Sequence, residues 1–382
     1  MWMRDAVEQD DVPTMEQMSK RPYDYFPYRY GHAFWVYFTG IYGDGIIRPL
    51  LYETGKGGYR KAIDTLTGVS PDTLSQFFIK QLKNTHKPYL ENKTKESGEK
   101  LFDASNAGEI NIAPSLSPDG EDLVFISDRN VISIDYYLAD IDKKEITQKI
   151  TNVIRNEHID AYSFLESAGT WSPDGKHFAI TTFIDGMNKL VIVNLEDEKI
   201  VRTIEPDQLE SFNNPEWSPD GEKIVISGLH RGESDLYLLN LETEELEQLT
   251  DDNYSDLHPA WSPDGSTIIF ASDRGRDTDL SNMQFGRFRL ALYDLKTNNI
   301  ETLEILRGAD IINPQFSPDG SEIYFVSNAD GYRNLYNYNF NNEMVRKLTD
   351  FQTGVSGISK LSPCFDISSG SEELIYILYK DD

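Results

Sequence analysis

Residues 215–221 read Pro-Glu-Trp-Ser-Pro-Asp-Gly, and residues 259–265 read Pro-Ala-Trp-Ser-Pro-Asp-Gly. The final four residues of this stretch, Ser-Pro-Asp-Gly, occur five times, beginning at Ser117, Ser172, Ser218, Ser262 and Ser317. A degenerate sixth copy, Ser-Pro-Cys, begins at Ser362. The successive spacings are 55, 46, 44, 55 and 45 residues, close to the ~40–45 residues that a four-stranded propeller blade needs. The repeat therefore predicts a β-propeller.

The backbone geometry that a tight turn requires explains why these four residues recur in this order. Proline holds φ near −65°, aspartate accepts hydrogen bonds from nearby backbone N–H groups, and glycine adopts the positive φ that closes a hairpin. The five aspartates could be read as a catalytic or metal-binding set, but a turn role explains their spacing better. We therefore expect structural carboxylates at Asp119, Asp174, Asp220, Asp264 and Asp319.

The residues around each turn predict strands. A bulky residue precedes each copy and is expected to wedge between neighbouring blades: Leu116, Trp171, Trp217, Trp261, Phe316 and Leu361. An apolar strand such as 123–126 follows the turn. An alternating third strand comes next, at 189–195, 235–241 and 334–340, and a fourth ends in Leu-Thr at 249–250 and 348–349.

Counting strands predicts how the ring closes. The sixth repeat supplies a second strand at 374–379, and the printed sequence then ends at Asp382. Segments 89–92 and 99–102 align with the third and fourth strands of other repeats and would complete this sheet from the N-terminal side. The fold class predicted is therefore mainly β: residues 87–382 form a six-bladed β-propeller without exposed sheet edges. A small α-helical segment, residues 1–86, precedes it.

The repeats resemble those of the TolB-like, WD-repeat-like bacterial propellers. The resemblance rests on Pro-x-Trp-Ser-Pro-Asp-Gly at 215–221 and 259–265, on Ser-Asp-Arg at 127–129 and 272–274, and on the terminal Leu-Thr pairs. It implies a periplasmic or extracellular protein that binds a protein or peptide, or that gates an enzyme. The start of the chain shows no signal peptide, which leaves a cytoplasmic location as the alternative.

The first 86 residues predict helices at 30–42, 46–54 and 58–66. A fourth helix is expected from an N-cap at Ser70 to about Lys83, burying Leu74, Phe77, Phe78 and Leu82. Residues 1–6, 28–34 and 68–71 resemble the C-terminal end of a gluzincin-type zinc peptidase domain. The His-Glu-x-x-His motif of such enzymes is absent from the sequence. The alternative function is therefore the substrate-gating propeller portion of a larger zinc metallopeptidase.

Composition argues against several other classes of protein. A net charge of −28 repels phosphate backbones, so nucleic-acid binding is not expected. No apolar run of ~18 residues could span a membrane, and one cysteine, Cys364, forms no internal disulfide. Gly-x-Ser-x-Gly is absent, and the acidic clusters 251–252 and 277–279 lack regular ligand spacing. We expect no catalytic residues, no metal site and no cofactor.

The propeller axis is the predicted binding site. The innermost strands place one residue per blade near the mouth of the axial tunnel, namely Ala113, Ala168, Asn214, His258, Asn313 and Ile358. Asp256 lies two residues before His258 and joins this set. Asn214, Asp256, His258 and Asn313 are therefore predicted to bind a polar peptide or protein loop, the alternative being a water-filled channel. Insertions at 153–168 and 275–289 could shape a partner surface. The function predicted is a non-catalytic scaffold of the bacterial cell envelope.

Overall fold

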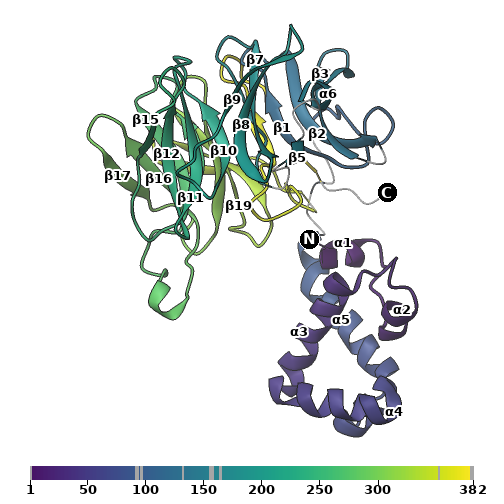
Figure 1. Ribbon diagram of the computed structural model, residues 1–382. Coiled ribbons are helices and arrows are strands. Elements are labelled where there is room, and N and C mark those ends of the chain that lie inside the picture. The colour runs from purple at the N-terminus through teal and green to yellow at the C-terminus, as the bar shows by residue number, and fades with distance from the viewer. Residues whose placement is uncertain are drawn as a thin grey trace. The chain divides into compact units, whose positions relative to one another are not determined.

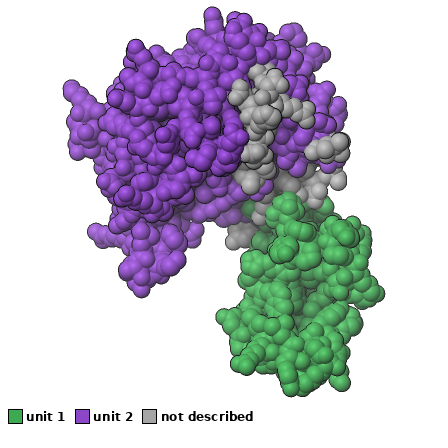
Figure 2. Space-filling view, in the orientation of Figure 1, with its two compact units in different colours: residues 1–95, 351–353, 380–382 green, residues 96–350, 354–379 purple. Residues whose placement is uncertain are grey.

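The computed structural model describes residues 2–90, 94, 98–130, 133–154, 159–162, 166–351 and 353–378. The chain divides into two compact units, shown in different colours in Figure 2. The first comprises residues 1–95, 351–353 and 380–382, and is helical over most of its described length. The second comprises residues 96–350 and 354–379 and contains all the named strands.

The first unit is a small helical assembly around an aromatic core. Its elements are α1 (Trp2–Glu8), α2 (Met15–Lys20), α3 (Pro27–Tyr42), η1 (Asp44–Ile46), α4 (Ile47–Thr67) and α5 (Pro71–Leu90). Phe34 of α3 stacks on Phe38 and meets Phe78 of α5 edge-on, at centroid distances of 5.9 and 5.5 Å. Among the described residues, no helix is long and apolar enough to cross a membrane.

The helices agree with the sequence in kind and differ in extent. The helix expected at 30–42 is confirmed as α3. The two expected at 46–54 and 58–66 are one element, α4, kinked at Gly58, whose φ of 79° is not helical. The helix after Ser70 is confirmed, with the Ser70 hydroxyl accepting from the Thr73 amide at 3.2 Å. Phe77 is not buried as predicted, because its side chain is 51% exposed.

The second unit contains five antiparallel sheets arranged as blades around an axis (Figure 1). Four of these blades have four strands each, and one has five. The first blade is β1 (Asn111–Leu116), β2 (Asp122–Asn130), β3 (Ser133–Asp140) and β4 (Glu145–Lys149), and helix α6 (Ile150–Ile154) follows it. In the second, β5 (Ile159–Tyr162) and β6 (Thr170–Trp171) both pair with β7 (His177–Ile184), which continues to β8 (Met187–Asn194) and β9 (Lys199–Ile204). The predicted insertion at 153–168 therefore supplies β5 in its described part.

The remaining three blades follow in chain order. They are β10 (Ser211–Trp217), β11 (Lys223–His230), β12 (Glu233–Asn240) and β13 (Leu246–Gln248); β14 (Asp256–Trp261), β15 (Thr267–Ser272), β16 (Arg289–Asp294) and β17 (Asn299–Leu303); and β18 (Ile311–Phe316), β19 (Glu322–Ser327), β20 (Asn334–Asn339) and β21 (Met344–Lys347). The short helix η3 (Leu280–Asn282) lies in the second predicted insertion, between β15 and β16.

The structure has five blades, not the six predicted. The last sheet has only two strands, β22 (Phe365–Ile367) and β23 (Leu374–Tyr376). Strand β22 contacts both β18 and β1, so this small sheet lies between the fifth blade and the first. The innermost strands β1, β6, β10, β14, β18 and β22 contact one another in sequence, and they surround the axis as a ring.

The two N-terminal strands expected to complete the last sheet do not form in the described residues. Residues 89–90 are the end of helix α5, whereas 91–93 lie outside the described residues. Residues 99–102 are described and are not a strand. Phe102 instead stacks on Phe125 of the first blade at 4.9 Å. Its side chain joins the blade core while its backbone stays outside the ladder.

The sixth repeat lies six residues later than the sequence suggested. In every blade the amide of the turn serine donates to the carbonyl five residues on, as Ser218 does to Lys223 at 2.9 Å. The equivalent bond in the last sheet joins Ser368 to Glu373 at 3.0 Å. The turn is therefore Ser-Ser-Gly-Ser at 368–371, and the copy beginning at Ser362 is not the turn. Cys364 and Ile367 consequently replace Ile358 and Leu361 as the equivalents of the ring and wedge positions.

The five Ser-Pro-Asp-Gly turns have the predicted structural role. In the turn at Ser262, the serine hydroxyl donates to the Asp264 carboxylate at 2.7 Å, and the Ser266 amide donates to the same oxygen at 3.0 Å. Gly265 has φ of +69°, as the turn requires. Each aspartate accepts the same pair of bonds, which lowers its carboxyl pKa in all five turns.

Tryptophan side chains tie neighbouring blades together, as the wedge prediction required. The indole of Trp171 donates to the Ser115 carbonyl of the first blade at 3.0 Å, and that of Trp261 donates to the Glu216 carbonyl of the third at 3.1 Å. Trp217 differs, because its indole donates to Gly221 within its own turn at 3.0 Å. Interblade contact at these positions therefore includes a directional bond as well as apolar packing.

The tryptophans generate a testable prediction about stability. Trp171→Phe removes the indole donor to the buried Ser115 carbonyl and part of the wedge volume, and is expected to lower the free energy of unfolding by about 1–2 kcal/mol. Trp217→Phe is the matched control, and water can replace its bond at the partly exposed Gly221, so the loss should stay below about 1 kcal/mol. Urea titration followed by circular dichroism measures both. Equal losses would contradict the interblade role of Trp171.

Candidate functional site

A bend in the innermost strand of four blades shapes the axial site. The register between β10 and β11 shifts between Asn213 and Glu216, and Asn214, directly before Pro215, has φ of 51°. The first, fourth and fifth blades bend at the equivalent position, with φ of 52° at Ala113, His258 and Asn313. Asparagine and histidine are enriched among residues with this left-handed conformation, whereas it is unusual for alanine.

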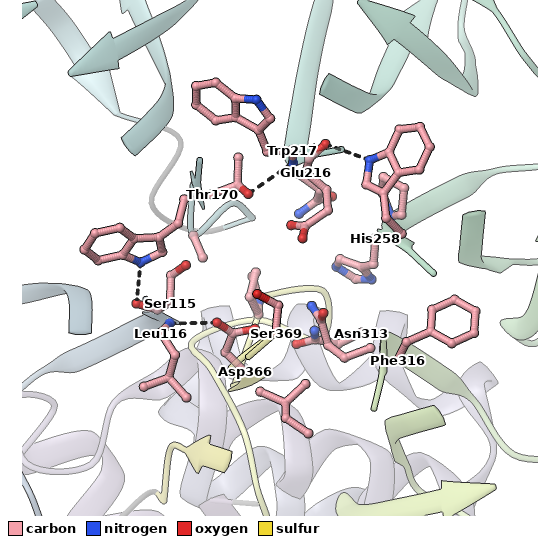
Figure 3. Close-up of a pocket in the computed structure, with 18 of the residues that line it drawn as sticks. Ser115, Leu116, Thr170, Glu216, Trp217, His258, Asn313, Phe316, Asp366 and Ser369 are labelled. Atoms are coloured by element: carbon pink, nitrogen blue, oxygen red, sulfur yellow. Dashed lines mark hydrogen bonds between the residues drawn. The ribbon is translucent and has the colours of Figure 1, made fainter. Parts of the chain in front are cut away.

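These inner strands enclose a cavity of about 280 Å³ on the axis (Figure 3). Every blade and the last sheet contribute to its wall. Prolines of the turns line the cavity together with the strand residues. Of these, Pro173, Pro219 and Pro263 are exposed to solvent. Its polar lining side chains are Ser115, Thr170, Asn214, Glu216, His258, Asn313, Gln315, Ser317, Asp366 and Ser369.

Three of the four predicted site residues line this cavity, namely Asn214, His258 and Asn313. Ala168, from the same predicted ring, also lines it. Asp256 does not, and neither do Ala113 and Ile358. Ile358 is 47% exposed, as expected from the corrected register of the last repeat.

The three lining residues also join segments around the axis. Asn214 donates to the carbonyl of Glu166, before β6, and Asn313 accepts from the amide of Cys364 at 3.0 Å. His258 Nε2 lies 2.8 Å from the carbonyl oxygen of Leu361. Because a carbonyl only accepts, Nε2 carries the proton of a neutral imidazole in this contact. Burial lowers the pKa of His258 to about 4, which keeps it neutral.

Asp256 belongs to a different cluster. Its carboxylate accepts from Arg274 at 2.6 Å, and Asp252 accepts from the same guanidinium at 3.1 Å. Burial raises the pKa of Asp256 to about 6, and Arg274 opposes that rise. Asp235, Asp252 and Asp256 are close enough to share a cation. Arg274 already neutralises two of them, so the arginine of the Ser-Asp-Arg copy at 272–274 forms an ion pair inside the blade, whereas Arg129 of the first copy is exposed.

Sequence reasoning missed two carboxyl groups on the axis, Glu216 and Asp366. Both line the cavity, and Figure 3 shows their side chains directed into it. Burial and then repulsion from Asp366 raise the pKa of Glu216 to about 8, and the Thr170 hydroxyl opposes the rise. Burial raises the pKa of Asp366 to about 7, opposed by the Leu116 amide, which donates to its carboxylate at 2.7 Å. The pKa values of both carboxyl groups therefore lie near neutral pH.

A signal for one of these residues was present in the sequence. Glu216 lies two positions after the predicted ring residue Asn214, and the alternation of a regular strand would have placed it on the same side. Asp366 occupies the corresponding position in the last sheet. It could not be found that way, because the Ser-Pro-Cys copy placed the repeat in the wrong register.

Comparisons with known proteins agree with this architecture. A family model described as TolB beta propeller domain matches residues 154–287. The crystal structure of TolB from Acinetobacter baumannii superposes with a TM-score of 0.51 at 17% sequence identity, over 65% of this chain. The second unit is a β-propeller similar in fold to TolB, and we call it the TolB-like propeller for that similarity. At this level of identity the TolB-like propeller shares a fold with that protein, and the chain spans 56% of that protein's length.

Other solved propellers are similar at lower scores. A putative TolB from Agrobacterium tumefaciens has a TM-score of 0.48 at 19% identity, covering 65% of this chain and 86% of that one. Oligogalacturonate lyase from Vibrio parahaemolyticus has 0.47 at 18% identity, covering 69% and 72%. A comparison with curated proteins finds no match. The family match lies within the TolB-like propeller, and no comparison supports the expected likeness of residues 1–86 to a gluzincin domain.

The raised pKa values predict how stability depends on pH. A carboxyl whose folded pKa lies above its unfolded value destabilises the fold as the pH rises through that interval. For Glu216 the interval runs from 4.5 to about 8. Glu216→Gln should therefore stabilise the TolB-like propeller at pH 9 by on the order of 2 kcal/mol and change little at pH 4.

The control is Glu222→Gln, an exposed glutamate on the turn of the same blade. Urea titrations of the three proteins at pH 4, 7 and 9 make the comparison. A Glu216→Gln variant that is destabilised at pH 9 would show that Glu216 is needed in its charged form for folding.

Proposed function

We propose that the TolB-like propeller binds a peptide or protein segment at its axial cavity and acts as a non-catalytic scaffold in the bacterial periplasm or outside the cell. The observation that carries this proposal is the cavity itself. Its wall combines hydroxyl, amide, imidazole and carboxyl groups from the inner strands with tryptophan, phenylalanine and proline. Concave apolar surfaces with a few convergent polar groups are typical of binding sites.

The size of the cavity limits what can enter. About 280 Å³ lies below the ~300–1,000 Å³ of most small-molecule sites. It suits a single side chain, a chain end or the tip of a loop. The rest of a partner would lie on the exposed ring of proline turns, where Pro173, Pro219 and Pro263 present apolar surface. This division between a central anchor and a surrounding surface is common at protein interfaces.

A second surface supports binding of a protein rather than a free small molecule. The insertion at 275–289 exposes 75% of Met283 and 65% of Phe285. Figure 1 shows the hairpin around η3 extending beyond the body of its blade. Its base is fixed, because Asp277 accepts from Arg289 and from the Arg287 amide. A projecting loop with exposed aromatic and thioether groups on an ordered base is suited to contact a partner.

Blocking the cavity mouth tests this function. Ser369 is exposed and lines the cavity at the position equivalent to the turn prolines, so Ser369→Trp should fill the mouth without disturbing the core. Peptides selected from a random library on the unmodified chain should bind Ser369→Trp at least tenfold more weakly, because their anchor can no longer enter. Fluorescence anisotropy of the labelled peptides measures the dissociation constants.

Thr243→Trp provides the control, since Thr243 is exposed in the outer turn between β12 and β13. This variant should bind like the unmodified chain. Recovery of no peptide, or equal binding by both tryptophan variants, would overturn the axial site. Hydrolysis of the bound peptides by the purified chain would overturn the scaffold role.

A further inference from the structure

The axial cavity contains two acidic groups without a counter-ion among the described residues. Glu216 and Asp366 are its acidic lining residues, and no described residue that lines it is a lysine or an arginine. Neither carboxyl group takes part in an ion pair of the described residues. The Leu116 amide donates to Asp366 at 2.7 Å, and the Thr170 hydroxyl is near Glu216. Neutral donors of this kind leave the net charge of the pair uncompensated.

An unsatisfied acceptor lies in the same wall. His258 is 5% exposed, and its buried Nδ1 atom has no hydrogen-bond partner in the part of the chain that the structure describes. Since Nε2 carries the proton toward Leu361, Nδ1 presents a lone pair. Buried polar atoms are rarely left without a partner. This acceptor is therefore an observation independent of the carboxyl pair, and both point to a ligand that donates.

The nearby cations are occupied elsewhere. Arg333, which acts on the pKa of His258, donates to the carbonyl of Lys360 at 2.7 Å and to that of Ser359 at 3.3 Å. Arg274 is paired with Asp252 and Asp256. Lys360 pairs with Asp310 at 3.0 Å. None of these side chains forms an ion pair with Glu216 or Asp366 among the described residues.

We propose that the cavity is a subsite for an organic cation, the guanidinium or ammonium group of a basic residue, held by Glu216 and Asp366 with His258 Nδ1 as an additional acceptor. A guanidinium offers five N–H donors and no acceptor, and an ammonium offers three donors. Either can donate to the two carboxyl groups and to the lone pair of His258 Nδ1. The inference rests on the proposed function and specifies it: the anchor of the bound segment is an arginine or a lysine.

A divalent metal ion fits this wall less well. Hard cations take six or more oxygen ligands, whereas the cavity presents two carboxyl groups, one of which already accepts from Leu116. The groups of three acidic residues that could hold an ion are found elsewhere among the described residues. One is Glu233, Asp235 and Asp251, and the other is Asp235, Asp252 and Asp256. Binding of calcium or magnesium in place of an organic cation is treated below as an outcome of the test.

The proposal predicts a pH dependence with a definite sign. The titratable groups of the cavity wall are Glu216, Asp366 and His258, with pKa values raised to about 8, raised to about 7 and lowered to about 4. A cation favours the deprotonated carboxyl pair, and it must displace a bound proton near neutral pH. Affinity for a permanently charged guanidinium should therefore rise between pH 6 and pH 9. His258 stays neutral throughout that range.

The experiment uses matched neutral and charged probes. N-acetyl-arginine amide, N-acetyl-lysine amide and N-acetyl-citrulline amide are titrated into the full chain by isothermal calorimetry at pH 6, 7.5 and 9, with EDTA present. We expect the arginine or lysine probe to bind at least tenfold more tightly than the citrulline probe, which has nearly the same shape without the charge. Glu216→Gln and Asp366→Asn should each weaken that binding at least tenfold, and Glu222→Gln should not change it. Circular dichroism verifies that the variants are folded.

Each other outcome has a defined meaning. Equal binding of the arginine and citrulline probes, no binding of either cationic probe, or unchanged binding in Glu216→Gln overturns the cation subsite. The cation subsite is also overturned if calcium or magnesium chloride binds in the absence of EDTA, if both carboxyl variants lose that binding, and if the organic cations do not bind.

The two proposals fail separately. Library peptides that bind at the mouth without enrichment of basic residues would leave the peptide-binding function standing and remove the subsite. Binding of the cationic amides without any binding of library peptides would leave the cation subsite standing and remove the peptide-binding function.

Discussion

The bend before proline in the innermost strands is the constraint on which the TolB-like propeller depends. The inner strands converge on the axis. A strand that stayed straight there would clash with the inner strands of the neighbouring blades. A one-residue bulge at Ala113, Asn214, His258 and Asn313, with φ of 51–52°, turns each strand at the same height. Proline follows each of these residues and fixes the next φ.

The same bend determines the chemistry of the axis. It turns Asn214, His258 and Asn313 toward neighbouring segments, where their side chains bond to backbone groups of Glu166, Leu361 and Cys364. Glu216, two residues after Asn214, lines the cavity, and so does Asp366 at the corresponding position of the last sheet, which lacks the bend. Two partly buried acids at the centre of the ring cost stability when they are ionised, because no opposite charge among the described residues pairs with them.

The turn chemistry made most of the propeller predictable from the sequence. Ser-Pro-Asp-Gly uses local hydrogen bonds that do not depend on distant contacts, so all five turns and their wedge residues could be read directly. The last sheet could not be read in this way. Its turn, at 368–371, lacks both proline and aspartate and keeps only the glycine and the backbone bond from Ser368 to Glu373.

The predicted number of blades failed for a related reason. Residues 89–90 have the alternating apolar character of a strand, yet they continue an amphipathic helix that begins at Pro71. A short apolar stretch does not distinguish between the two, and the helix that precedes it decides. The site was predictable to the same extent: the residues before the proline were found by counting along the repeat. The acid on the last sheet depended on a register that only three-dimensional pairing defines.

The position of the lone cysteine gives the ring a built-in reporter. Cys364 is fully buried beside Asn313, in the sheet with the fewest strands, where the chain closes between β18 and β1. A thiol reagent can reach this sulfur only when that seam separates. The rate of alkylation of the unmodified protein therefore measures how often the propeller opens at its two-stranded sheet, without any engineered label.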